Sequence, residues 1–209
     1  MKTKLLALGL ALVSVSLFAQ GKVGFVNDSA RLFMMGPGVL GPDVAYAGQP
    51  IPTAGLPSGG LSAILYAGTS AGSLSLQTAI PLTGTSIPAA GRMATKNVVL
   101  AGVPGGAPAY FEIILVSTTA SLPNSIVGGA YNATIFTGAV YFSTSGLFTF
   151  SPGASVTYPV IYSGTSTWDA HPIVLNVPEP SVLALTGIFG ALLAVHRRRR
   201  VEYKVGPMY

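Results

Sequence analysis

The chain has 209 residues, of which half are hydrophobic and only 8% carry a charge, and its formal net charge is +5. The basic residues gather at the two ends, because the span from residue 21 to residue 176 holds four basic and four acidic residues and is neutral. A neutral body excludes a nucleic acid as partner, and the absence of cysteine excludes disulfides, thiolate metal sites and a cysteine nucleophile.

Residues 1–21 have the pattern of a secretory signal peptide. Two lysines precede an apolar stretch from Leu5 to Phe18, and small residues follow it. We expect this segment to form a signal helix that directs export. Cleavage after Ala19 would place Leu17, which is not a small residue, at the third position before the cut, whereas cleavage after Gly21 would place Ala19 there. We leave both positions open.

The span 22–176 is predicted to be an all-β domain. Clusters of Gly and Pro separate short segments that are rich in β-branched and aromatic residues, and no interior segment sustains a helical period. We expect the strands to form a two-sheet β-sandwich or a jelly roll. The expected strands cover residues 22–27, 61–67, 97–102, 109–117, 139–143, 146–151 and 171–177.

Three details of this domain can be predicted. The stretch 34–60 is rich in turn residues and is expected to be a long surface loop. Alternation in the last aromatic strand places Phe148 and Phe150 on the face opposite to Leu147. Glu112 is expected at a solvent-facing or edge position, and no second carboxylate lies at the spacing that glycoside hydrolysis requires.

Candidate catalytic patterns lack the context that their chemistry needs. The segment 68–72 fits the G-x-S-x-G nucleophile elbow around Ser70, but a strand and not a helix is predicted to follow it. The segment 36–41 fits G-x-G-x-x-G, but a proline follows where a phosphate-binding helix should begin, so a loop is expected. A serine hydrolase would have to use Ser70 with His171 and the nearby Asp169. We expect no catalytic residues, no metal site and no cofactor.

Two groups of residues are candidates for carbohydrate binding or for glycosylation. Trp168, Tyr158 and Tyr162 are a possible aromatic platform for stacking on sugars, and packing in the core is the favoured alternative. The segments that begin at Asn27 and Asn132 fit the N-glycosylation sequon. Serine and threonine are frequent in the body, so O-linked modification is open as well.

The C-terminal part consists of three consecutive features. They are the motif Val177, Pro178, Glu179, Pro180, Ser181; the uncharged apolar run 181–195; and the cluster Arg197, Arg198, Arg199, Arg200. The two prolines hold the motif extended. As a helix the run would be about 22 Å long against a ~30 Å hydrocarbon core, and the arginines would reach the headgroups from it. Basic clusters stay on the cytoplasmic side, so both ends would face the cytoplasm with the body outside.

This order resembles the PEP-CTERM sorting signal of exopolysaccharide-producing Gram-negative bacteria. The resemblance implies recognition of the Pro-Glu-Pro motif by an exosortase-type processing enzyme, anchoring in the inner membrane by residues 182–195, and arrest by the four arginines. It further implies release to the cell surface or the exopolysaccharide matrix. Such proteins usually end within a few residues of the basic cluster, whereas this chain continues.

The resulting organisation has four parts. We expect a signal peptide at 1–21, an exported all-β domain at 22–176, the sorting signal with its transmembrane helix at 177–200 and a cytoplasmic tail at 201–209. A structural or adhesive role without enzymatic activity is the leading hypothesis. A carbohydrate-binding module is the alternative, and a serine hydrolase ranks last.

Overall fold

The computed structural model describes residues 19–39, 41–130 and 135–176, and the predictions for residues 1–18 and 177–209 lie outside this part. The regular secondary structure of the described residues is mostly strand, which confirms the all-β prediction. Their helical elements include the short 3-10 segments η2 (Gly41–Tyr46) and η3 (Gly84–Ser86). Within the same ranges, no helix has the length and apolar character that crossing a membrane requires.

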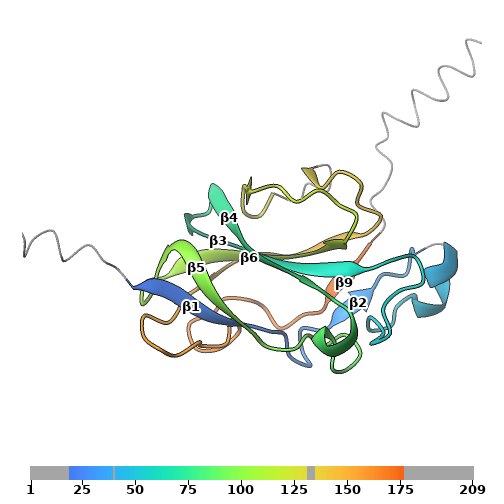
Figure 1. Ribbon diagram of the computed structural model, residues 1–209, viewed down its shortest axis with the longest axis horizontal. Helices are drawn as coiled ribbons and strands as arrows, with labels where there is room; N and C mark the ends of the chain where they lie inside the picture. The colour runs from blue at the N-terminus through green and yellow to red at the C-terminus, as the bar shows by residue number, and fades with distance from the viewer. Residues whose placement is uncertain (1–18, 40, 131–134, 177–209) are drawn as a thin grey trace, which may run out of the picture. The chain divides into compact units, whose positions relative to one another are not determined.

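A five-stranded antiparallel sheet forms the centre of the domain (Figure 1). Its members, in spatial order, are β7 (Ser125–Ile126), β4 (Ser73–Pro81), β3 (Leu61–Ser70), β6 (Ala109–Ser117) and β8 (Phe142–Phe150). The predicted strand at 109–117 and the observed β6 cover the same residues. Because β3 and β6 lie in the middle of the sheet, each pairs with a strand on both of its edges.

Strand β8 joins two segments that the sequence predicts as separate strands. The residues between the two predicted strands do not end the strand, because they form an irregularity in the pairing of β8 with β6 between Glu112 and Ile114. Gly146 has a φ of 73°, and the Ser145 hydroxyl oxygen accepts a hydrogen bond from the backbone N–H of Ile113 at 3.0 Å. A bulge of this kind absorbs extra residues without ending the strand.

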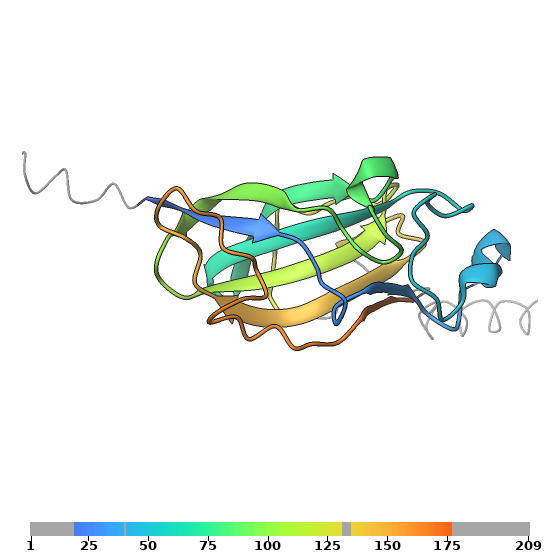
Figure 2. The same ribbon diagram turned by 90° about the horizontal axis from the view of Figure 1, so that it is seen from below.

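Two short ribbons face one side of the sheet (Figure 2). The first pairs β1 (Gln20–Phe25) with β5 (Lys96–Pro104) in antiparallel fashion. The second pairs β2 (Phe33–Met35) with β9 (Ile173–Leu175) in parallel. The edge of β1 that faces away from β5 is hydrogen-bonded to the segment 153–161. The N–H of Lys22 donates to the Gly153 carbonyl at 3.0 Å, and the N–H of Gly24 donates to the Pro159 carbonyl at 2.8 Å.

The main hydrophobic core fills the space between this sheet and the ribbons. It combines apolar side chains from β3, β6 and β8 with others from all four ribbon strands. Phe148 and Phe150 belong to it, whereas Leu147 packs on the opposite face of the sheet, which confirms the predicted alternation. Contributors from the ribbons include Val23, Phe25, Phe33, Met35, Val98, Leu100, Ile173 and Leu175.

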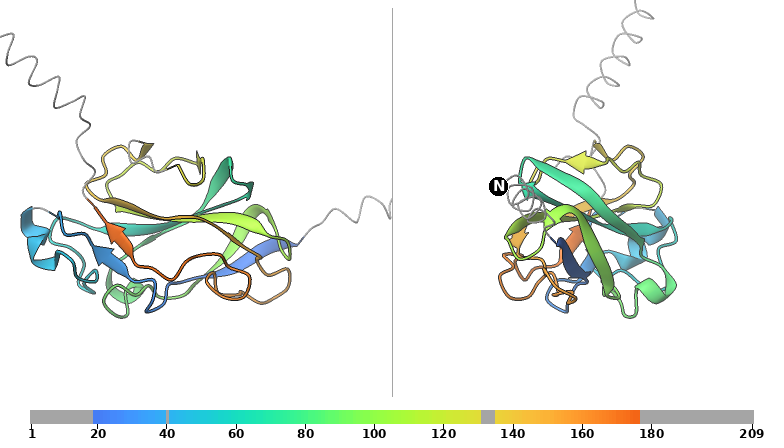
Figure 3. Two further views of the ribbon diagram at one scale, coloured as in Figure 1. Left: turned by 180° about the vertical axis from the view of Figure 1, so that it is seen from behind. Right: turned by 60° about the vertical axis from the view of Figure 1, so that its left-hand side comes forward.

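The other face of the sheet is covered by the segment between β6 and β8, here called the cover segment and described at residues 118–130 and 135–141 (Figure 3). A second, smaller hydrophobic cluster lies beneath it. Strands β3 and β6 are therefore buried on both faces along most of their length. Strands buried in this way read as continuous apolar runs and lose the clean alternation of a half-exposed strand.

The stretch 34–60 has the loop character that the sequence predicts and many exposed residues, but it is anchored on β2. It begins inside β2, and its residues 48–51 hydrogen-bond that strand: the N–H of Met35 donates to the carbonyl of Gln49 at 2.8 Å, and the N–H of Ile51 to that of Phe33 at 3.0 Å. η2 also lies in this stretch and directly follows the segment 36–41. The turn residues therefore mark direction changes within a packed segment, because Ile51 is almost fully buried.

Candidate functional site

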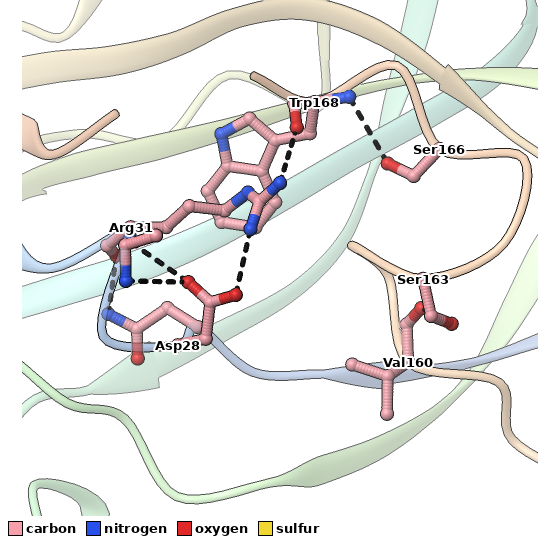
Figure 4. A network of polar contacts seen from close by, with 8 residues as sticks. Asp28, Arg31, Val160, Ser163, Ser166 and Trp168 are labelled. Atoms are coloured by element: carbon pink, nitrogen blue, oxygen red, sulfur yellow. Dashed lines mark hydrogen bonds and ion pairs between the residues drawn. The ribbon is translucent and has the colours of Figure 1, made fainter. Parts of the chain in front are cut away.

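Two of the three aromatic residues proposed as a glycan platform, Trp168 and Tyr162, lie against Arg31. Figure 4 shows the Arg31 side chain beside the Trp168 indole. Arg31 follows β1 in a turn that Asp28 organises, because Asp28 Oδ1 accepts hydrogen bonds from the backbone N–H groups of Ala30 and Arg31 at 3.0 and 2.9 Å. Aspartate commonly stabilises turns in this way. The turn directs the Arg31 side chain toward the segment between β8 and β9, which carries Trp168 and Tyr162.

The Arg31 guanidinium is held by polar and aromatic contacts at once. Its Nη1 lies 2.8 Å from Asp28 Oδ2, and its Nη2 donates to the Trp168 carbonyl oxygen at 2.7 Å. Its central carbon lies 5.3 Å from the ring centres of both Tyr162 and Trp168. Cation–π contacts are strongest where water is excluded, and the Arg31 side chain is only 12% exposed.

Trp168 belongs to the core. It is 3% exposed, and Phe148 stacks on its indole with ring centres 5.4 Å apart and planes 20° apart. With Phe148 and Arg31 both against the ring, no face is open to a sugar. The indole Nε1 and the Arg31 Nε are buried without a hydrogen-bond partner among the described residues.

The two tyrosines do not form a shared platform with Trp168. Tyr158 and Tyr162 are half-buried, and Lys22 Nζ lies 5.8 Å from the Tyr158 ring centre. Each of these aromatic residues thus meets a cation from β1 or from the turn that follows it. This arrangement ties the segment between β8 and β9 to the N-terminal strand and favours the core-packing alternative.

The candidate catalytic residues occupy separate and exposed positions. Ser70 ends β3, and its hydroxyl oxygen accepts from the N–H of Gly72 at 3.2 Å in the turn that leads directly into β4. His171 and Asp169 are exposed ahead of β9, where the N–H of His171 donates to the Asp169 carbonyl at 2.9 Å. Among the described residues, no hydrogen bond joins Ser70 to His171, and no cluster of three metal-ligating side chains occurs.

The prediction that Glu112 faces solvent or an edge is wrong. Glu112 is 2% exposed in the middle of β6, on the face that the cover segment shields. Its Oε1 accepts from the Thr144 hydroxyl at 2.5 Å, and its Oε2 accepts from the backbone N–H of Gly129 at 2.9 Å. A buried carboxylate requires such partners, and Gly129 belongs to the cover segment, which the strand sequence by itself does not place there.

Two further buried polar groups stabilise the loops, and no sequence pattern marks either of them as buried. Asn27 is fully buried: its Nδ2 donates to the carbonyls of Gly91 and Arg31 at 2.7 and 2.9 Å, and its Oδ1 accepts from the N–H of Met93 at 2.6 Å. With all these contacts in place, its side-chain amide is not accessible to a glycan in the folded domain. The other sequon, at Asn132, lies outside the described residues.

The second group joins the stretch 34–60 to the cover segment. Asp43, in η2, is fully buried and accepts from the Tyr141 hydroxyl at 2.5 Å and from the N–H of Ser58 at 3.1 Å. Burial, and then the hydrogen bond to the Asp43 carboxylate, raise the pKa of Tyr141 above its ordinary value. The pair is a neutral phenol donating to a carboxylate, a charge-assisted contact that fixes both segments.

These contacts define an all-β domain whose distinctive polar residues are used in folding. The sorting motif 177–181 and the arginines 197–200 lie outside the described residues. Comparison of the chain with family models, with curated proteins and with solved structures finds no match.

Proposed function

We propose that this chain is an exported protein, sorted by its C-terminal signal to the cell surface or the exopolysaccharide matrix, where its β-domain has a structural or adhesive role. The observation that carries the proposal is the order of the C-terminal features: a Pro-Glu-Pro motif, an apolar run and four arginines. Basic residues flank the apolar segments at both ends of the chain, which keeps both ends in the cytoplasm and the body outside.

The β-domain is consistent with this proposal. Its strands run from Gln20 to Leu175, between the two apolar end segments. We infer that the central sheet and the two ribbons form one β-sandwich, because a single hydrophobic core joins them. Without cysteine, such a domain is stabilised outside the cell by packing and by buried polar contacts alone.

A structural role is favoured over the two alternatives by where their candidate residues lie. Trp168 of the carbohydrate-binding alternative is in the core. Ser70 and His171 of the hydrolase alternative lie on different turns without a mutual hydrogen bond in the described region. A matrix protein needs a stable body that withstands the extracellular medium. Trp168 contributes to that stability in the core, and Ser70 and His171 are each exposed without the other.

The test is a fractionation of cells that express the full chain in a Gram-negative host with an exosortase. Glu179→Ala removes the acidic side chain of the motif, and Glu202→Ala is the matched control, since it makes the same change beyond the arginines. We expect the Glu179→Ala chain to accumulate in the inner membrane, while the control is released into the surface and matrix fractions as the unchanged chain is. Equal release of both variants would contradict the sorting proposal.

A further inference from the structure

The first residues of β1 are an integral part of the fold. Gln20 pairs with Pro104 of β5, and Gly21 is buried. A Cβ atom at Gly21 would lie 2.9 Å from Pro152 Cγ and 3.0 Å from the carbonyl oxygen of Val103. The first separation is shorter than real Cβ contacts show and the second is tighter than most of them, so a side chain at Gly21 would force its neighbours to shift.

The two possible cleavage positions differ in what they leave of this strand. A cut after Gly21 would delete Gln20 and Gly21 and expose the buried Pro152 and Val103 that Gly21 contacts. It would also place a terminal ammonium at Lys22, whose backbone nitrogen donates to the Gly153 carbonyl at 3.0 Å within the strand pairing. Because Lys22 is half-buried, a charge on its backbone nitrogen would be partly desolvated and would lower the stability of the folded domain.

A cut after Ala19 leaves the whole strand. It removes one hydrogen bond, in which the N–H of Gly105 donates to the Ala19 carbonyl at 2.9 Å. Ala19 and Gln20 are both exposed, so the new terminal charge would stand in water. Between the two products, only the one that begins at Gln20 retains all of β1.

We propose that the exported chain is cut between Ala19 and Gln20 and that the new N-terminus closes to pyroglutamate. This inference rests on the proposed export, because a chain that stays in the cytoplasm is not cut here. The cut converts the Gln20 backbone nitrogen into a free amine that can reach its own side-chain carboxamide carbon, and the exposed side chain is free to turn back on it.

The ring closure needs no oxidant and no cofactor. The Gln20 amine attacks the carbon of its own side-chain carboxamide, the bond from that carbon to the amide nitrogen breaks, and the nitrogen leaves as ammonia. The product is a five-membered lactam that retains one N–H but has lost the positive charge. An end of this kind resists aminopeptidases, which require a free amine, and this suits a protein that resides outside the cell.

The experiment uses the full chain, expressed in the same host and recovered after export. Intact-mass and N-terminal peptide spectrometry would identify the first residue and its modification, with pyroglutamate aminopeptidase treatment before N-terminal sequencing as the second measurement. Gln20→Ala is the matched control, since it preserves the strand but provides no carboxamide. We expect blocked pyroglutamate at position 20 in the natural chain and a free, directly sequenceable alanine at the N-terminus of the variant.

The outcomes separate this inference from the proposal on which it rests. A mature chain that begins at Lys22 would overturn the cleavage position while leaving export intact. A chain that begins at Gln20 with a free amine would overturn the ring closure. A chain that still carries Met1 and is found in the cytosol would overturn export itself, and this inference with it.

Discussion

The two faces of the five-stranded sheet are buried by different means. On the face toward the ribbons, the core is apolar and contains an aromatic stack in which the Phe111 ring centre lies 5.9 Å from those of both Phe148 and Phe150. On the face toward the cover segment, the apolar cluster is smaller, and sheet side chains hydrogen-bond the segment directly. Tyr66 donates to the Pro123 carbonyl at 2.8 Å, and Glu112 accepts from Gly129 at 2.9 Å.

The two faces differ because the ribbons and the cover segment satisfy their backbone hydrogen bonds in different ways. The ribbon strands pair with one another and with neighbouring loops, so they present mainly apolar side chains to the sheet. In its described residues, the cover segment pairs with the sheet through the two-residue strand β7 and a few single backbone hydrogen bonds. Its buried backbone groups therefore need partners from the sheet's side chains. Ser117 shows this most clearly, because its hydroxyl oxygen accepts from the N–H groups of both Val140 and Tyr141.

The largest expected effect is on the ribbon side. Phe111→Ala removes a fully buried ring from the aromatic stack, and truncations of this kind cost about 3–5 kcal/mol of unfolding free energy. Val99→Ala on β5 is the control, because Val99 is 47% exposed and its truncation should cost little. Chemical denaturation of the exported domain measures both. Equal midpoints for the two variants would show that this core does not dominate stability.

A smaller and more local effect is expected on the cover side. Glu112→Ala leaves the Gly129 N–H and the Thr144 hydroxyl without their partner, at a cost of roughly 1–3 kcal/mol for buried polar groups. Limited proteolysis should then cut within residues 118–141 before the rest of the domain unfolds. Asp169→Ala removes an exposed carboxylate and serves as the control. If the cover segment of the Glu112→Ala variant is not cut early, its attachment to the sheet does not depend on the Glu112 hydrogen bonds.

The smallest effect at neutral pH belongs to Tyr66. Tyr66→Phe removes one hydrogen bond, worth about 1 kcal/mol. Burial raises the pKa of Tyr66 to about 12, whereas an exposed phenol titrates near ~10. The folded state favours the neutral phenol, so this contribution is complete below the unfolded pKa and is lost as the pH rises through the folded one.

The pH dependence of stability in the alkaline range tests this assignment for Tyr66. Denaturation midpoints between pH 9 and pH 12 should fall less steeply in Tyr66→Phe than in the natural chain, and part of the fall should remain because the pKa of Tyr141 is raised too. Tyr46→Phe, at a half-buried tyrosine, is the control. Parallel pH curves for the Tyr66 variant and the natural chain would refute the assignment.

Local patterns predicted much of the strand content but not the layers. The β-branched and aromatic composition of 109–117 identified β6, and alternation placed Phe148 and Phe150 correctly, since both depend on neighbouring residues only. The sequence predicted two strands, 139–143 and 146–151, where the structure has the single strand β8 with a bulge, which local composition does not reveal. For the candidate sites, Trp168 was rightly favoured as a core residue, whereas two of the three partners of Asn27, Gly91 and Met93, lie more than sixty residues away and leave no local signal.

By itself, the sequence determined the all-β class, the neutral body and the positions of the strongest strands, because these follow from composition and from short-range periodicity. Only the tertiary structure decided that the central sheet is covered on both faces and hence that Glu112 is buried, and that residues 48–51 are hydrogen-bonded to β2. Burial of a residue depends on segments that return from far along the chain. A periodicity within one strand describes the two sides of that strand but not what comes to lie against them.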